Sequence, residues 1–466
     1  MKNILKEIEG KYPVDTILVN GEQVWPYLRT AYDLQYFKKI SSQEGERPLW
    51  TSLSFLAKLK RLLNIPYGMK HWLGKYDYIA ISSTGERRSI NGKYFNRLLD
   101  TIIDKLGRDK VLYIEIPIPS LHPIESIYTS KVVCYDVVEL LAMITEVFTL
   151  RRYKIKNESV LQNINKEYDL SVDYQKVIKR FHARRMVFSL LFRMKKPKVV
   201  LLSCYYGLLQ SAIKAAKDSG AKVIEFQHGS IGEEHPEYNV YIELDKGSFP
   251  DYLAVFGKKE LETFSDSRFI QPQHVYPVGS FYIEYVRTNH IPNENLVQRL
   301  KKYEVCIGVT LASTTERRTV EFVHQAAVLD RDICYLLIPR HPEEEHYASF
   351  ELPDNVMIVK NQNFYELMML ADFHATVYST CAIEAPSLGV QNILINIDGL
   401  AKRFYGNVLN DSRITRFVET PEDFVRVANS FEKLDRDTIV KLNKDLIAVD
   451  YERNIQELLR CPPFLE

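Results

Sequence analysis

The sequence lacks most of the features that mark specialised classes of protein. It contains few cysteines for its 466 residues, and they are scattered without a CxxC pair: Cys134, Cys204, Cys306, Cys334, Cys381 and Cys461. This pattern is typical of reduced thiols and excludes a disulfide framework. No apolar run approaches the ~20 residues of a membrane span, and the first ten residues, MKNILKEIEG, lack the apolar core of a secretion signal. These absences predict a cytoplasmic protein, with peripheral attachment to the inner face of the cytoplasmic membrane left open.

The net charge and the absence of several motifs exclude further classes of function. The net charge is only +1, so we expect no nucleic-acid partner. The sequence contains no GxxxxGK[ST] phosphate loop, no HExxH and no GxGxxG after an apolar run. We therefore predict that the protein requires no metal and holds no resident cofactor. With 46% hydrophobic residues, the chain can nevertheless bury a substantial core.

Runs rich in β-branched residues alternate with helical stretches, which predicts an α/β protein with parallel sheets. The predicted strands cover residues 15–21, 76–83, 110–117, 198–204, 221–227, 251–257, 304–312, 332–339, 355–360, 373–379 and 391–397. Residues 274–295, rich in Pro, Gly and Asn, suit a linker. We predict two Rossmann-like domains that face each other across a cleft, namely residues 1–285 with helical insertions and residues 286–440. The final segment, 441–466, is predicted to pack back on the first domain.

Ligands of such sheets bind beyond the carboxyl ends of the strands, so chemistry is expected at the strand-to-helix junctions. At the first junction, EFQHGSIGEEHPEY (225–238), His228 follows an apolar run. A neutral imidazole can take a proton from a hydroxyl near pH 7. Neighbouring residues of this junction are candidates to support it: Gln227, Gly229, Glu233, Glu234 and His235. The alternative is a histidine that satisfies a backbone carbonyl in a turn.

Two later junctions suit anion binding. In YLLIPRHPEEEHY (335–347), Arg340 and His341 precede a proline that can open a helix. In ATVYSTCAIEAPSLG (375–389), Ser379 and Thr380 stand where a strand becomes a helix, and free helix NH groups can bind phosphate there. Glu384, one turn on, could accept hydrogen bonds from ribose hydroxyls. The alternatives are an exposed Arg–His pair and a serine that only caps the helix.

These strings resemble parts of GT-B glycosyltransferases that build bacterial capsules, lipopolysaccharide and teichoic acids. IPRHPEEE (338–345) resembles the histidine–proline motif of CMP-sugar sialyl- and Kdo transferases, and NFYELMMLADFHATVYST (363–380) resembles the segment that follows it in Kdo transferases. EFQHG (225–229) is similar to the histidine–glycine turn of CDP-glycerol polymerising enzymes. The resemblance covers residues 195–400. Gln227-His228-Gly229 stands where sialyltransferases carry acidic residues before glycine, and Val377-Tyr378-Ser379 replaces a glycine-rich turn of Kdo transferases.

The resemblance implies metal-independent transfer of a sugar from a CMP-linked donor to a hydroxyl of a surface glycan or lipid-linked acceptor. His228 would be the base. Arg340, His341, Ser379 and Thr380 would bind the donor phosphate, with Glu384 near the ribose. The first domain would bind the acceptor and the second the donor nucleotide. Three alternatives stay open: a CDP-polyol phosphotransferase, an NDP-sugar epimerase and a non-catalytic relative.

Basic segments raise the question of a membrane or anionic acceptor. Residues 55–75 carry five cations and no acid among Leu, Trp and Tyr residues, which suits an anionic membrane surface or, equally, a solvated face. Residues 174–217 carry eleven Lys or Arg and no acid, and for 174–198 a solvated face balanced by acids elsewhere is favoured, with FSLLF (188–192) in the core. Arg87 and Arg88 are weaker candidates for contact with an anionic acceptor.

Overall fold

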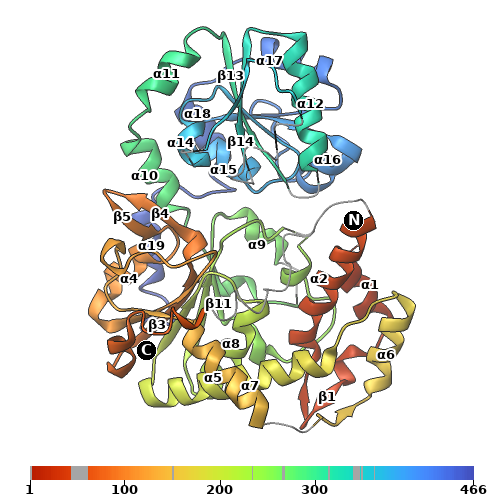
Figure 1. The fold of residues 1–466 in the computed structure, drawn as a ribbon, viewed down its shortest axis with the longest axis vertical. Helices are drawn as coiled ribbons and strands as arrows, with labels where there is room; N and C mark the ends of the chain where they lie inside the picture. The colour runs from red at the N-terminus through yellow and green to blue at the C-terminus, as the bar shows by residue number, and fades with distance from the viewer. Residues whose placement is uncertain are drawn as a thin grey trace. The chain divides into compact units, whose positions relative to one another are not determined.

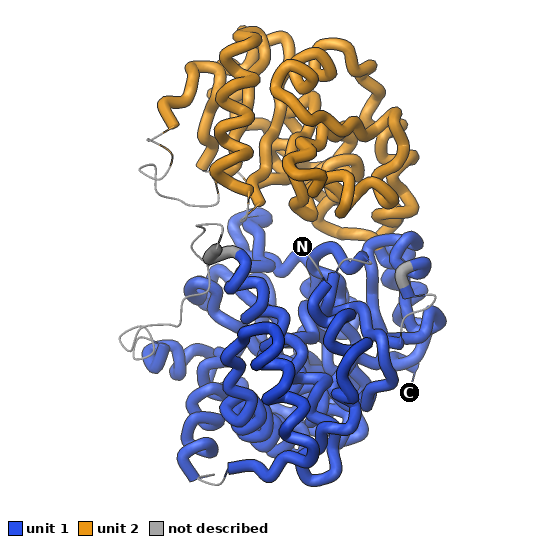
Figure 2. Tube along the Cα trace, turned by 90° about the vertical axis from the view of Figure 1, so that its right-hand side faces the viewer, with its two compact units in different colours: residues 1–278, 452–466 blue, residues 279–451 orange. Residues whose placement is uncertain are grey.

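The computed structural model divides the chain into two compact units, one of residues 1–278 and 452–466 and one of residues 279–451 (Figure 2). It describes residues 3–43, 61–148, 152–232, 235–264, 268–312, 315–339, 347, 350–360 and 363–465. The predicted boundaries at 285 and 440 fall inside helices α10 (Phe281–Asn289) and α18 (Arg436–Asn443), whereas the units divide at Gly279 and Glu452.

Unit 1 is built on a parallel sheet of order β12-β11-β10-β9-β3-β6-β7 (Figure 1). In chain order its strands are β3 (Tyr78–Ser83), β6 (Val111–Ile116), β7 (Val132–Cys134), β9 (Val199–Leu202), β10 (Lys222–Phe226), β11 (Tyr252–Val255) and β12 (Val275–Pro277). All six neighbouring pairs are parallel. The central strands are buried along almost their whole length, as a sheet covered on both faces requires.

Helices cover this sheet, and two small antiparallel sheets lie beside it. The helices are α1 (Ile4–Lys11), α2 (Trp25–Gln43), α4 (Asp100–Leu106), α5 (Asp136–Phe148), α6 (Glu158–Glu167), α7 (Tyr174–Lys195), α8 (Gln210–Asp218), α9 (Lys259–Thr263) and α19 (Tyr451–Leu458). β1 (Leu18–Val19), β2 (Glu22–Gln23) and β8 (Ile155–Lys156) form one small sheet, so the predicted strand 15–21 lies outside the main one. β4 (Arg87–Ile90) and β5 (Lys93–Asn96) form a hairpin. Its turn, Asn91-Gly92, has positive φ at both residues, as a two-residue hairpin turn favours.

Unit 2 contains a second parallel sheet of order β15-β14-β13-β16-β17-β18. Its strands are β13 (Val305–Thr310), β14 (Ile333–Ile338), β15 (Val356–Ile358), β16 (Phe373–Thr376), β17 (Gln391–Ile395) and β18 (Thr415–Val418). With α10 and α18, its helices are α11 (Glu294–Leu300), α12 (Glu316–Leu329), α14 (Phe364–Met368), α15 (Cys381–Ser387), α16 (Leu400–Tyr405) and α17 (Pro421–Ser430). The α/β prediction is confirmed. All six cysteines are free, and Cys134, Cys306 and Cys334 are buried.

Both sheets have the same strand order when their strands are numbered along the chain. Starting from β3 or from β13, each reads 3-2-1-4-5-6, and unit 1 adds β12 as a seventh strand at one edge. This is the doubly wound order of nucleotide-binding sheets, in which the chain leaves the centre first in one direction and then in the other. The reversal falls between β3 and β9 in unit 1 and between β13 and β16 in unit 2. In such sheets ligands bind at the carboxyl ends of the strands beside this point.

Candidate functional site

In unit 1, polar side chains meet at the strand ends beside this reversal. Glu86 follows β3, Tyr206 follows β9, and His228 follows β10, the next strand of the sheet. Arg97, directly after the β4–β5 hairpin, joins them by donating from Nε to Glu86 Oε2 at 2.9 Å and from Nη2 to the His228 carbonyl at 3.1 Å. The structure therefore places His228 in a polar cluster at the edge of the sheet where a ligand is expected.

The His228 imidazole is half-buried, and its Nε2 lies 3.4 Å from the Tyr206 hydroxyl. Burial lowers the pKa of His228, and Arg97 lowers it further, whereas Glu86 raises it. The ring is therefore held neutral at pH 7, the form in which it can accept a proton. This environment suits a base, and the role of His228 stays a proposal.

The Glu86–Arg97 pair gives a direct test of this electrostatic balance. Replacing Glu86 with glutamine removes the nearby anion, so the pKa of His228 is expected to fall further. Replacing Arg97 with glutamine removes the nearby cation, so that pKa is expected to rise. Histidine ring NMR titrations of the parent and of both variants measure the two shifts. Shifts of the same sign in both variants would contradict the assignment of these two residues.

Gln227 and Gly229 shape the turn that carries His228. Gln227 Nε2 donates to the Gly229 carbonyl at 2.8 Å and to Glu260 Oε1 at 2.9 Å, while its Oε1 accepts from Phe256 N at 2.6 Å. The buried Gln227 amide thus ties the turn to β11 and α9. Burial raises the pKa of Glu260 to about 7. The structure gives Gln227 a supporting position beneath the turn.

His235 also packs against Tyr206. Its ring centroid is 5.7 Å from that of Tyr206 and 4.9 Å from that of Tyr238. Burial, with smaller contributions from His228 and Arg29, lowers the pKa of His235 to about 3, so this imidazole is also neutral. Glu233 and Glu234 lie outside the described residues.

The segment after His235 is held by one fully buried arginine. Arg29, on α2, donates to the carbonyls of Pro236, Glu237 and Asn239 at 2.8–3.0 Å. Its Nε also donates to Glu9 Oε1 at 3.0 Å. Because these carbonyls come from residues immediately after His235, Arg29 fixes the backbone on that side of the cluster.

Two buried carboxyls behind the cluster were not predicted. Glu225, inside β10, accepts from the Tyr238 hydroxyl at 2.5 Å, and burial raises its pKa to about 8. Burial also raises the pKa of Glu237 to about 7, although Arg29 opposes the shift. A glutamate within the apolar run VIEFQ (223–227) was the available signal for Glu225.

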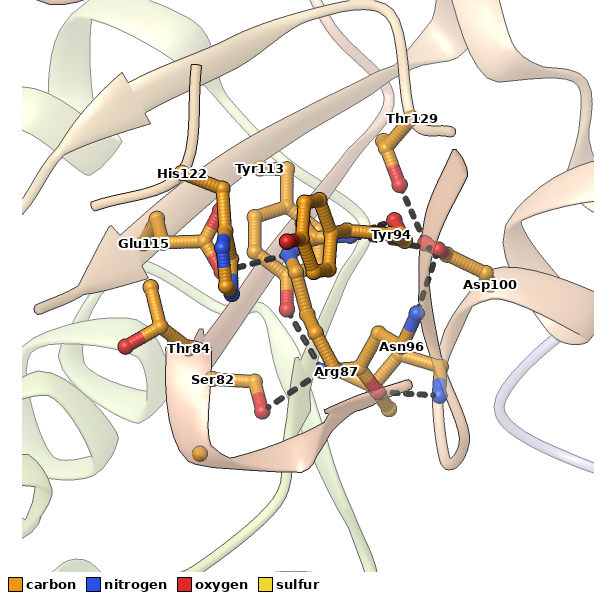
Figure 3. A network of polar contacts seen from close by, with 12 residues as sticks. Ser82, Thr84, Arg87, Tyr94, Asn96, Asp100, Tyr113, Glu115, His122 and Thr129 are labelled. Atoms are coloured by element: carbon orange, nitrogen blue, oxygen red, sulfur yellow. Dashed lines mark hydrogen bonds and ion pairs between the residues drawn. The ribbon is translucent and has the colours of Figure 1, made fainter. Parts of the chain in front are cut away.

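Arg87 does not lie where the sequence prediction needs it. Its side chain is fully buried in an ionic network, where Nε donates to Glu115 Oε1 at 2.7 Å and Nη1 lies 3.3 Å from Asp100 Oδ2 (Figure 3). Its guanidinium also lies over the Tyr113 ring. A group enclosed in this way is unavailable to an acceptor in solvent. Arg88 is half-buried and donates to the carbonyls of Gly85 and Arg87.

This network fastens the β4–β5 hairpin to the end of the sheet. Asn96, on β5, donates from Nδ2 to Ser82 Oγ at 3.1 Å and to the Tyr113 hydroxyl at 2.8 Å (Figure 3). Its backbone N–H donates to Asp100 Oδ2 at 2.7 Å. Because Arg97 follows Asn96 in the chain, the network also fixes the arginine that reaches the His228 carbonyl.

In unit 2, a buried histidine ties three strands together beneath the reversal of strand order. His374 Nδ1 pairs with Asn392 Oδ1 at 2.8 Å, and Nε2 pairs with Thr310 Oγ1 at 2.9 Å. Burial lowers the pKa of His374 to about 4. Asn392 Nδ2 also donates to the Ala382 carbonyl at 2.8 Å, so the first turn of α15 is anchored to β17.

Ser379 and Thr380 stand at the start of α15, directly after β16. Ser379 Oγ accepts from the Cys381 backbone N–H at 3.3 Å, and the Ser379 carbonyl accepts from the Tyr405 hydroxyl at 2.7 Å. Both serine and threonine remain half-buried. The N-cap of α15 is Thr380, whose side chain makes no capping hydrogen bond, so Ser379 precedes the cap and binds the first N–H of the helix. Both residues follow β16, which borders the point where the strand order reverses.

The other predicted donor-binding residues are Glu384, Arg340 and His341. Glu384 is buried, and its Oε1 accepts from the Tyr365 hydroxyl at 2.8 Å, so its carboxylate is engaged inside unit 2. Arg340 and His341 lie outside the described residues.

Across the described parts of both units, no group of three or more His, Cys, Asp or Glu side chains is arranged to hold a metal ion. No helix among these parts has the length and apolar character that crossing a membrane requires.

Comparisons with known proteins identify the fold. No protein-family model matches the sequence, and no curated protein matches it. Among solved structures, a protein named as a UDP-N-acetylglucosamine 2-epimerase, from Listeria monocytogenes, aligns over 83% of this chain and 95% of its own, with a TM-score of 0.51 and 10% identity. The S. aureus MnaA–UDP structure aligns over 82% and 96%, also with a TM-score of 0.51 and 10% identity. The chain has the two-domain α/β fold of the GT-B type.

Proposed function

We propose that the protein is a glycosyltransferase that moves a sugar from a nucleotide-activated donor to a hydroxyl of a bacterial surface glycan or lipid-linked acceptor. The observation that carries the proposal is the pair of doubly wound sheets, each with polar side chains where its strand order reverses. The bound UDP of the S. aureus MnaA structure supports a nucleotide donor for this fold.

In the proposed reaction, unit 1 supplies the base. His228 accepts the acceptor's hydroxyl proton as that oxygen forms a bond to the anomeric carbon of the donor sugar. The bond between this carbon and the phosphate oxygen breaks, and the nucleotide leaves with the electron pair. A neutral imidazole suits this step because it gains one proton and needs no other partner.

Unit 2 is proposed to hold the nucleotide. The hydroxyls of Ser379 and Thr380 and the N–H groups that open α15 would bind the phosphate as its charge develops, together with Arg340 and His341. Losing one such preorganised donor typically costs ~3 kcal/mol of transition-state stabilisation. His374 and Asn392 support the start of α15 from within the sheet.

The nucleotide is tested by thermal shift with CMP, CDP, UDP and GDP. We expect CMP and CDP to raise the melting temperature, because the strings around residues 338–345 and 363–380 resemble those of CMP-sugar transferases. The double variant Ser379→Ala/Thr380→Val should weaken nucleotide binding about tenfold or more, since each lost hydroxyl leaves a charged phosphate with fewer donors. Ser430→Ala, at the end of α17, is the matched control and should bind as the parent does.

The outcome of the thermal-shift experiment tests the choice of nucleotide separately from the proposed function. Stabilisation by UDP alone would show that the CMP assignment is wrong while keeping a nucleotide-sugar enzyme. Absence of any nucleotide effect would contradict the function itself. Transfer assays with CMP-sugars and CDP-polyols then distinguish glycosyl transfer from polyol-phosphate transfer.

An epimerase is the second candidate, because the Listeria monocytogenes structure with this fold is named as a 2-epimerase. An epimerase changes its nucleotide sugar without an acceptor. Incubating the protein with UDP-N-acetylglucosamine alone and following the sugar by NMR therefore separates the two. Conversion to the 2-epimer would favour the second candidate over glycosyl transfer.

A further inference from the structure

Helix α5 presents apolar side chains on the side that faces away from the sheet. Val138 and Ala142 are buried against unit 1. Leu141, Ile144, Val147 and Phe148 are exposed, Phe148 by 83%. A surface helix normally turns its polar residues outward, so this outer face of α5 needs an explanation.

Helix α7 continues the same surface. Arg184 pairs with Glu139 at 2.6 Å and Arg180 with Glu146 at 3.5 Å, so α5 and α7 lie side by side over the sheet (Figure 1). α7 buries Phe188 and Phe192 toward the core. Its outward positions carry Met186, Leu190 and Met194, each with roughly three-fifths of its surface exposed.

The segment 61–75 extends this surface at the start of α5 and the end of α7. Arg61 pairs with Asp136 at 2.6 Å, and Lys195 donates to the carbonyls of Trp72 and Gly74. Twelve of the 22 exposed large apolar side chains of the described residues come from these three elements: Leu62, Leu63, Met69, Leu73, Leu141, Met143, Ile144, Val147, Phe148, Met186, Leu190 and Met194. We call them the α5–α7 face. Such a concentration marks a contact surface, because single exposed apolar residues are normally scattered.

The charges on this face decide what covers it. Its acidic residues, Asp136, Glu139 and Glu146, are each neutralised by an arginine. The cations Lys70, Lys75, Arg193 and Lys196 are exposed, and none of them forms an ion pair within the parts of the chain that the structure describes. The face therefore combines apolar side chains with a net positive charge. A second copy of the chain would bring the same charge against it, whereas an anionic surface would complement it.

We propose that the α5–α7 face docks on the surface of an anionic lipid bilayer. The apolar side chains enter the boundary between headgroups and acyl chains, and the lysines and arginines lie among the headgroup phosphates. The surface is larger than the basic segment 55–75 that the sequence indicated, of which residues 55–60 lie outside the described residues. Docking is independent of the proposed reaction, although it would bring unit 1 to lipid-linked acceptors.

Vesicle co-sedimentation of the full chain tests this surface. We expect binding to vesicles of phosphatidylcholine with phosphatidylglycerol, weak binding to phosphatidylcholine alone, and loss of binding as salt rises. The variant V147S/F148S should bind the mixed vesicles at least about tenfold more weakly, because two exposed apolar anchors are lost. K70Q/R193Q should also lose about tenfold, since each cation near an anionic surface contributes several-fold.

The matched control is V328S/L329S, which removes two neighbouring, half-exposed apolar residues at the end of α12 in unit 2. It should bind vesicles as the parent does, and circular dichroism and thermal melting should show that every variant folds. Failure of the parent chain to bind the mixed vesicles, or equal binding by V147S/F148S, would overturn the proposal. A dimer that V147S/F148S converts to a monomer, without vesicle binding, would assign the face to a second copy instead. No substrate is present, so these outcomes are separate from failure of the glycosyltransferase proposal.

Discussion

Replacing Arg87 with methionine is expected to lower the free energy of unfolding by about 3–5 kcal/mol, the usual effect of removing one partner from a buried ion pair. The guanidinium contacts both Glu115 and Asp100, whose pKa values burial raises. Without Arg87, the two buried carboxyls must either stay ionised with no cation beside them or bind protons, and both lower the stability of the folded protein. Urea denaturation measures the difference between the variant and the parent.

Arg88→Met is the control, because this neighbouring arginine contacts only backbone carbonyls of its own loop among its hydrogen bonds. Its effect should stay within about 1 kcal/mol, as for surface substitutions away from special features. If Arg87→Met does not fold, Arg87→Met/Glu115→Gln should recover part of the loss, since it removes one of the stranded charges. Equal stability of Arg87→Met and Arg88→Met would refute the role given to the network.

Replacing His228 with alanine is expected to reduce kcat for sugar transfer by about 10²–10⁴-fold, the usual contribution of a general base. Nucleotide binding, measured by thermal shift, should not change, because the proposed nucleotide site lies in unit 2. The parent should lose activity as the pH falls through the pKa of His228, since only the neutral ring accepts a proton. A lowered pKa in the folded protein extends activity toward acidic pH.

His274→Ala is the matched histidine control, because His274 precedes β12 at the amino end of the sheet, away from the strand ends that carry His228. It should leave kcat unchanged. A His228→Ala variant with the activity of the parent would show that the base lies elsewhere. Such a variant would still transfer the sugar, so this result would reject His228 as the base without rejecting a nucleotide-sugar enzyme.

The sequence predicted most strands of the two main sheets, because each of these strands is a continuous apolar run that can be recognised without knowing its neighbours. Ten of the eleven predicted strands overlap strands of the two main sheets, whereas residues 15–21 include only the short β1. β7, β12 and β18 were missed although the equally short β15 was predicted. β7 is followed almost at once by the apolar helix α5, β12 lies in the segment assigned to a linker, and only the two end residues of β18 are buried. The predicted linker 274–295 contains β12, α10 and the start of α11, since proline and glycine there shape turns between ordered elements.

In the candidate site, too, the sequence predicted what depends on local patterns and missed what depends on contacts between distant segments. His228, Ser379 and Thr380 were predicted from the ends of apolar runs. The structure places Ser379 and Thr380 after β16, beside the reversal of strand order, and His228 after β10, one strand away from it. The enclosure of Arg87 could not be predicted, because its partners come from β6 and α4, far along the chain. Likewise, the balance of the basic helix 174–195 depends on acids elsewhere, as Arg184–Glu139 and Arg185–Glu22 show. Within FSLLF the core assignment is confirmed for Phe188, Leu191 and Phe192, while Leu190 is exposed.

The return of the chain to unit 1 at Glu452 has a consequence for biosynthesis. Helix α19 buries Ile455 and Leu458, and Asn454 donates to the Val278 carbonyl, so the residues that complete unit 1 follow unit 2 in the chain. A ribosome therefore finishes all of unit 2 before unit 1 has its last helix. Unit 2, a continuous segment, can fold as it emerges, whereas the contacts of α19 with unit 1 form only after unit 2 has been synthesised.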